Sequence, residues 1–105
     1  MISAHGEFTS KDGVITGNFT ETGTGNEYIL TGDMNPRVNF KCSKAVLQYP
    51  SSADLQGTES YIGTIGTNSL DLSIGDKDKI TGRLDDDITH KNYISGTVRW
   101  VLRQV

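Results

Sequence analysis

The sequence has little cysteine, little proline and no cluster of basic charge. Its single cysteine, Cys42, cannot form an internal disulfide, so no disulfide framework holds the fold together. Only 2 of the 105 residues are proline, whereas 12 are glycine, a balance that argues against a disordered linker. The 10 Lys and Arg residues are scattered and the formal net charge is −3, unlike the basic stripe of a nucleic-acid binder. We therefore expect no nucleic-acid partner.

Long apolar runs are also missing. No stretch approaches the length of a membrane span, so we expect none. The first six residues, Met1–Gly6, lack the basic and apolar regions of a signal peptide, and by default we place the chain in the cytoplasm. The length suits one domain with one core, covering residues 1–105.

The strongest positive signal is a five-residue pattern, apolar–x–Gly–x–apolar, that occurs six times. Its instances are Ala4–Phe8, Ile15–Phe19, Leu30–Met34, Tyr61–Ile65, Ile80–Leu84 and Ile94–Val98. Side chains alternate between the two faces of a strand, so the glycine and both apolar residues share one face. The residues between them are mostly polar. The pattern therefore predicts antiparallel strands with one buried face.

The turn residues divide the chain into about eight strands. We expect these near residues 3–10, 14–21, 26–34, 37–48, 57–65, 69–75, 79–87 and 92–103. The fourth changes parity after Cys42, which predicts either a bulge near Ser43–Lys44 or a switch between sheets. Pro50 should end that strand, and the segment Ser51–Leu55 is the one candidate for a helical turn.

The hairpin loops set the registers between neighbouring strands. A two-residue loop at Asp12-Gly13 places Phe8 opposite Gly17 and Gly6 opposite Phe19. Later loops place Phe19 opposite Tyr28, Gly17 opposite Leu30, Ile15 opposite Gly32, Ile65 opposite Leu70, Gly63 opposite Leu72 and Leu72 opposite Gly82. In most of these pairs a glycine faces a large side chain, which fills the missing volume and covers the bare backbone.

The predicted fold is all-β: one antiparallel meander that closes into a small β-barrel. Closure removes the two bare edges of an open sheet, and glycines on the inner face permit the strong coiling of a narrow barrel. The final run, Tyr93–Val105, is the longest regular strand and could pair with both the preceding strand and the first. A two-sheet β-sandwich is the competing architecture.

Two segments, Lys11–Phe19 and Glu27–Asp33, resemble the second and third strands of avidin-type, calycin-like β-barrels. Those strands read Gly-x-Leu-Thr-Gly-x-Tyr and then Tyr-x-Leu-Thr-Gly. The resemblance implies the barrel architecture and no ligand. Where the family has a tyrosine that contacts the ureido oxygen of biotin, this chain has Phe19, and the family's pocket tryptophans are reduced to Trp100.

Candidates for catalysis are few. His5 and Glu7 alternate on the outward face of the first strand, where a solvated pair is expected, and His90 falls in a turn. Cys42 lies in the core pattern, where a buried free thiol is the default. No convergent acid–base set is visible, so we predict no catalytic residue and rank an enzyme third among the possible functions.

Acidic residues gather in two loops. Asp76 and Asp78 alternate with lysines, and the run Asp85–Asp87 ends the seventh predicted strand. The spacing does not match a calcium loop, and Asp is a common turn residue in its own right. We therefore predict no metal site and no cofactor.

Five large side chains fall on the inward parity of the strands: Phe19, Tyr28, Phe40, Tyr61 and Trp100. The first functional hypothesis is a non-enzymatic binding module in which these residues contact a small apolar or amphipathic ligand. The alternative is a structural or interaction domain with a filled core. It would self-associate as a homo-oligomer through outward apolar residues, namely Ile29, Ile62, Tyr93 and Val101.

Overall fold

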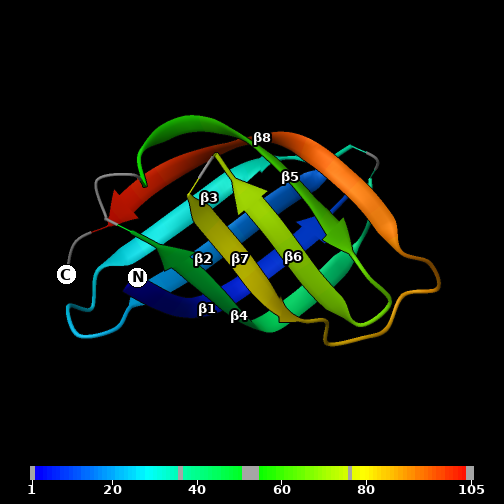
Figure 1. Cartoon of the computed structure of the whole chain (residues 1–105), viewed down its shortest axis with the longest axis horizontal. Helices are drawn as coiled ribbons and strands as arrows, with labels where there is room; N and C mark the ends of the chain where they lie inside the picture. Colours follow the sequence, from blue (N-terminus) through cyan, green and yellow to red (C-terminus); the bar gives the residue numbers. More distant parts are fainter. Residues whose placement is uncertain (1, 36, 51–54, 76, 104–105) are drawn as a thin grey trace.

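Eight β-strands run through the part of the chain that the structure describes, a computed structural model covering residues 2–35, 37–50, 55–75 and 77–103 (Figure 1). They are β1 (Ile2–Lys11), β2 (Val14–Glu21), β3 (Glu27–Asp33), β4 (Phe40–Tyr49), β5 (Gly57–Ile65), β6 (Ser69–Ile74), β7 (Asp78–Arg83) and β8 (Asn92–Arg103). No helix occurs among these residues, and so none there is long and apolar enough to cross a membrane. The helical turn predicted at Ser51–Leu55 falls mostly outside the described residues.

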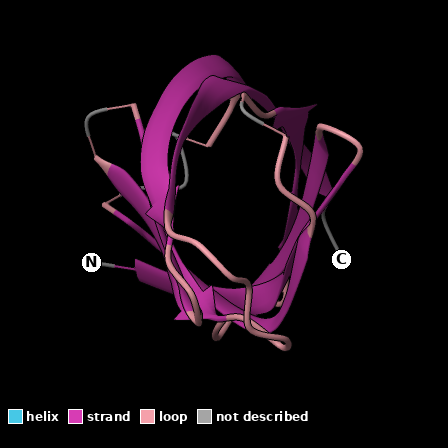
Figure 2. Cartoon of the chain, turned by 90° about the vertical axis from the view of Figure 1, so that its right-hand side faces the viewer, coloured by secondary structure: helices cyan, strands magenta, loops and turns pink. Residues whose placement is uncertain are grey.

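The strands close into one antiparallel barrel, as predicted, in the order β1-β2-β3-β8-β5-β6-β7-β4. Figure 2, which looks along the longest axis, shows the closed ring of strands. In Figure 1 the strands β5, β6 and β7 cross in front of β1, β2 and β3. The core therefore lies between two walls whose strands run obliquely to each other.

The strand order differs from a simple meander. The prediction that the last strand pairs with its predecessor and with the first strand is wrong, because β8 lies between β3 and β5. The place beside β1 is taken by β4, which also pairs with β7. The chain changes neighbours at its longer connections, such as residues 34–39 and 84–91, which are not bound by the register of a tight turn.

Most predicted registers are confirmed. Phe8 lies opposite Gly17, Gly6 opposite Phe19 and Gly63 opposite Leu72. Four further predicted pairs also lie opposite each other: Phe19–Tyr28, Gly17–Leu30, Ile15–Gly32 and Ile65–Leu70. Asp12 and Gly13 both have positive φ, of 54° and 82°, as the two central residues of a type I′ hairpin turn require.

One register is wrong by two residues. Leu72 faces Ile80, and Gly82 faces Leu70, because Ile74 already pairs with Asp78. The β6–β7 loop is therefore shorter than the predicted Gly75–Lys79 loop.

The predicted bulge in β4 is present. Gly6 pairs with Ala45 and Phe8 with Cys42, so the two residues Ser43 and Lys44 lie opposite Glu7 alone. The Asp85 carboxylate accepts hydrogen bonds from the Ser43 amide, at 3.0 Å, and from the Ser43 hydroxyl, at 2.5 Å. The strand β7 ends at Arg83 instead of continuing to residue 87, and beyond it the Leu84 and Asp85 amides donate to the carbonyl oxygens of Asn68 and Lys41. Likewise β4 begins at Phe40 instead of residue 37 and ends at Tyr49, before Pro50.

Candidate functional site

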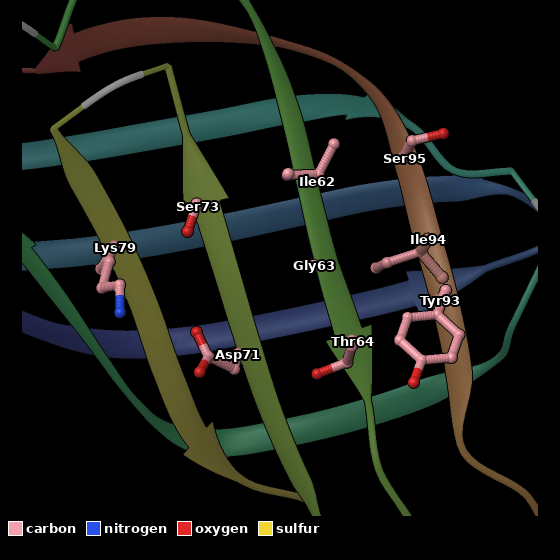
Figure 3. A pocket seen from close by; sticks show the side chains of 9 residues that line it. All are labelled: Ile62, Gly63, Thr64, Asp71, Ser73, Lys79, Tyr93, Ile94 and Ser95. Carbon is pink, nitrogen blue, oxygen red and sulfur yellow. The ribbon is translucent and has the colours of Figure 1, made fainter.

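A shallow groove lies on the outer face of the barrel, centred on β5 (Figure 3). Its volume is about 510 Å³. We call it the β5 groove. It is lined by Ile62, Gly63, Thr64, Asp71, Ser73, Lys79, Tyr93, Ile94 and Ser95.

Strand pairing places the lining side chains in two rows across the sheet. In the first row Thr64 of β5 stands between Asp71 of β6 and Tyr93 of β8. In the second row Ile62 stands between Ser73 and Ser95 in the same way. Alternation along each strand sends all six side chains outward. The outward side chains of β5 therefore lie between Asp71 and Ser73 of β6, with Lys79 of β7 beyond them, and Tyr93 and Ser95 of β8.

Two large hydrophobic side chains at this groove are exposed to solvent. Ile62 is 67% exposed and Tyr93 is 73% exposed. The Lys91 ammonium lies over the Tyr93 ring, 5.5 Å from its centroid, a cation–π contact that brings positive charge to this flank. Among the described residues, no hydrogen bond or ion pair engages the Asp71 carboxylate across the groove.

The five residues predicted to contact a ligand all lie in the core. Phe19, Tyr28, Phe40, Tyr61 and Trp100 are each at most 8% exposed. Their rings are engaged by neighbours within the chain: Phe40 stacks on Phe8 with centroids 5.7 Å apart, and Tyr28 meets Tyr49 edge to face.

The polar atoms of these core aromatics are also engaged. The Tyr61 hydroxyl donates to the Asp33 carbonyl oxygen at 2.6 Å, and the Trp100 indole N–H donates to the Glu59 carboxylate at 3.0 Å. Burial, together with the nearby Asp33 charge, raises the pKa of Tyr61 to about 12. These groups are satisfied as buried polar atoms normally are.

The space beside the inward glycines is filled. A methyl group added at Gly17 would lie 2.9 Å from the Phe19 ring and 3.1 Å from the Phe8 ring. At Gly82 it would lie 2.5 Å from the Cys42 sulfur, and at Gly63 it would meet the Leu72 side chain and the sheet backbone. No vacancy remains at these three positions for a ligand.

A buried carboxylate, Glu21, lies at the end of the barrel where β2 ends and β3 begins. It is 7% exposed and accepts hydrogen bonds from the hydroxyls of Tyr49, at 2.5 Å, Tyr28, at 3.5 Å, and Thr24. The Thr24 and Tyr49 hydrogen bonds outweigh burial and lower the pKa of Glu21. Burial and the Glu21 carboxylate together raise the pKa of Tyr49. The carboxylate thus connects β2, β3 and β4 at this end.

The remaining polar candidates are placed as surface or structural groups. His5, Glu7 and His90 are exposed, as predicted. Cys42 is buried and free, and burial raises the pKa of its thiol. Among the described residues, no group of three or more His, Cys, Asp or Glu side chains is placed to hold a metal ion. Asp76 lies outside the described residues.

The predicted outward apolar residues do not form one patch. Ile29 pairs with Val101, whereas Ile62 and Tyr93 lie on neighbouring strands at the β5 groove. Tyr93 and Val101 are eight residues apart on β8, a separation of about 26 Å at the usual rise per residue. Sequence reasoning singled out Ile62 and Tyr93 but not Asp71, Thr64 or Lys91. The predicted β5–β6 register already places Asp71 beside Thr64, whereas the pairing of β8 with β5, which adds Tyr93 and Lys91, was not predicted.

Comparison with protein-family models, curated proteins and solved structures found no match to this chain. The resemblance to avidin-type barrels stays a prediction.

Proposed function

We propose that the protein is a non-enzymatic interaction domain that self-associates through the β5 groove. The observation that supports this most directly is that Ile62 and Tyr93 are both exposed at the same groove, on the neighbouring strands β5 and β8. Large apolar side chains grouped on a surface mark contact sites more often than scattered ones do. Tyrosine is also among the residues enriched in protein interfaces.

The partner we infer is a second copy of this chain. Asp71 and Tyr93 lie on opposite sides of Thr64, in the row next to the apolar Ile62, and the Lys91 ammonium adds positive charge beside Tyr93. Lys79 also lines the groove, on β7 beyond the Asp71 strand. A surface with both signs of charge at equal distances from its centre is complementary to itself, as a two-fold interface requires.

The packing of the interior supports this proposal over a ligand held inside the barrel. The contacts at Gly17, Gly63 and Gly82 leave no room beside them, and the five core aromatics are already engaged. An apolar ligand would have to separate side chains that are in close contact, and interiors resist such expansion.

Sedimentation equilibrium over a range of protein concentrations tests the proposal. We expect a reversible monomer–dimer equilibrium that is lost in Ile62→Ser and Tyr93→Ser. Val14→Ser is the matched control, because Val14 is 58% exposed but lies outside the groove, and it should dimerise like the wild type.

Two results would contradict the proposal. One is a wild-type protein that stays monomeric up to about 1 mM, a concentration that detects associations of about 4 kcal/mol. The other is a monomer whose Trp100 fluorescence shifts on addition of an apolar probe, which would favour the ligand-binding hypothesis.

A further inference from the structure

We infer that the two copies pack with their two-fold axis parallel to β5, so that Asp71 of each copy faces Lys91 and Tyr93 of the other. This inference rests on the proposed self-association and specifies its geometry. In this geometry the side chains of Asp71, Lys91 and Tyr93 determine the orientation of the partner.

The positions follow from the first row of the groove. Asp71 and Tyr93 are both direct neighbours of Thr64, one on each side of β5 (Figure 3). Each therefore lies about 4.8 Å from the β5 line, the usual spacing of paired strands. A two-fold rotation about an axis along β5 preserves the row and exchanges its two sides. It carries the Asp71 carboxylate of one copy onto the Tyr93 position of the other.

The charges at that position are complementary. The Lys91 ammonium lies over the Tyr93 ring, so the incoming carboxylate would meet an ammonium group together with a phenol hydroxyl that can donate to it. Because the interface is two-fold, the contact occurs twice. Neither Asp71 nor Tyr93 has another hydrogen-bond partner among the described residues that it would have to give up.

The same charges disfavour the other simple arrangement. With the axis perpendicular to β5 and running along the first row, each strand would face its own copy across the interface. Asp71 would then meet Asp71, and the two Lys91–Tyr93 pairs would meet each other. Like charges placed opposite each other oppose association, so the charges favour the axis along β5 over this arrangement.

The curvature of the barrel limits the contact to the strands beside β5. The ring of strands is curved (Figure 2). Lys79 of β7 also lines the groove, but it lies two strands from β5 and so farther from the axis than Asp71 does. The contact is therefore a stripe over β6, β5 and β8. We expect it to belong to the small, transient class of interfaces rather than the large obligate class.

The test is a charge exchange between Asp71→Lys and Lys91→Asp. Alone, each variant places like charges opposite each other twice, and we expect its dimer to weaken at least about tenfold. Mixed in equal amounts, the two variants form a heterodimer in which both contacts again join opposite charges. We expect its dissociation constant to return to within about threefold of the wild-type value.

Native mass spectrometry distinguishes the species, because the two substitutions change the mass in opposite directions, and sedimentation equilibrium gives the affinities. Glu7→Lys is the control, since Glu7 is exposed on β1, away from the groove, and it should dimerise like the wild type. Both test positions are exposed, so we expect the variants to fold. Recovery of the heterodimer would itself demonstrate native folding.

The outcomes separate this inference from the proposed function. If the wild type dimerises, Ile62→Ser abolishes the dimer and the mixed variants fail to recover it, the orientation is wrong and self-association through the groove stands. The orientation is equally wrong if neither variant alone weakens the dimer. A wild type that never dimerises overturns both.

Discussion

Replacing glycine by alanine at Gly6 tests whether these glycines let the strands approach one another. A methyl group at Gly6 would collide with the backbone carbonyl of Asn18 and lie 2.9 Å from the Cα of Phe19. Both obstructing groups belong to the backbone of β2, which pairs with β1 along its whole length. Relief therefore requires the two strands to separate. Overpacking usually costs about 1–3 kcal/mol, and an immovable backbone places Gly6→Ala at about 3 kcal/mol or more.

Two further glycines provide graded comparisons. At Gly17 the added methyl would meet the rings of Phe19 and Phe8, at 2.9 and 3.1 Å, and rings can rotate or shift. We expect Gly17→Ala to lower the free energy of unfolding by about 1–2 kcal/mol. At Gly66 the nearest atoms belong to Ser69, at 3.5 and 3.6 Å, an ordinary contact. Gly66→Ala should be neutral or stabilising by up to about 1 kcal/mol, because alanine restricts the unfolded chain.

Urea unfolding monitored by Trp100 fluorescence measures all three variants. Trp100 is the only tryptophan, and its burial at 5% exposure makes its emission sensitive to unfolding. The midpoints should follow the order Gly66→Ala, Gly17→Ala, Gly6→Ala from highest to lowest, with unchanged slopes if only stability differs. Equal midpoints for Gly6→Ala and Gly66→Ala would refute the argument that close strand approach requires glycine.

Three other predictions concern buried or bonded polar groups. The pKa of Glu21 is held below its ordinary value of 4.5, so its contribution to stability should be complete above that value and lost below it, as the pH falls through the lowered pKa of the folded state. Stability between pH 3 and pH 6, measured by urea unfolding, should therefore vary less in Glu21→Gln than in the wild type. Asp85→Ala should destabilise the β4 bulge by removing both hydrogen bonds to Ser43, seen as faster amide exchange at Ser43 than in the matched Asp86→Ala. Cys42 is fully buried with a raised pKa, so a thiol reagent should label it only as fast as the protein opens, and equal rates in native and unfolded protein would contradict this.

Local patterns were enough to predict the hairpins and the bulge. The Asp12-Gly13 turn fixes the register of β1 and β2, since a two-residue loop leaves little choice of pairing. The change of parity after Cys42 likewise located the bulge. The apolar residues before and after this point have opposite parity, and one strand can bury both sets only if it contains an extra residue between them. In both cases the determining residues are close together in the sequence.

The order of the strands around the barrel could not be obtained in this way. Three connections join strands that are not neighbours in the barrel: β3 to β4, β4 to β5 and β7 to β8. All three are longer than the hairpin loops, so they do not bind one strand to the next in a single register. Their length was the available signal, and the pairing of β8 with β3 and β5 depends on which side chains fit around the whole ring.

The β5 groove could not be predicted from the sequence for the same reason, because it depends on the order of the strands. Tyr93 and Thr64 become neighbours only because β8 lies beside β5, and no short-range rule brings these two segments together. The parity of each strand did predict that Ile62 and Tyr93 point outward, which is a local property. An exposed apolar side chain could thus be predicted, but its charged surroundings could not.

The glycine signature connects the fold to the proposed function. A glycine beneath an aromatic ring lets two strands coil closely, and the ring then occupies the volume that a ligand would need. In this barrel the same residues that permit closure therefore remove the interior beside them as a binding space. The recognition surface that we propose is built instead from the outward parity of the strands. Beside β5, exposed apolar side chains and opposite charges occur together on that outward face.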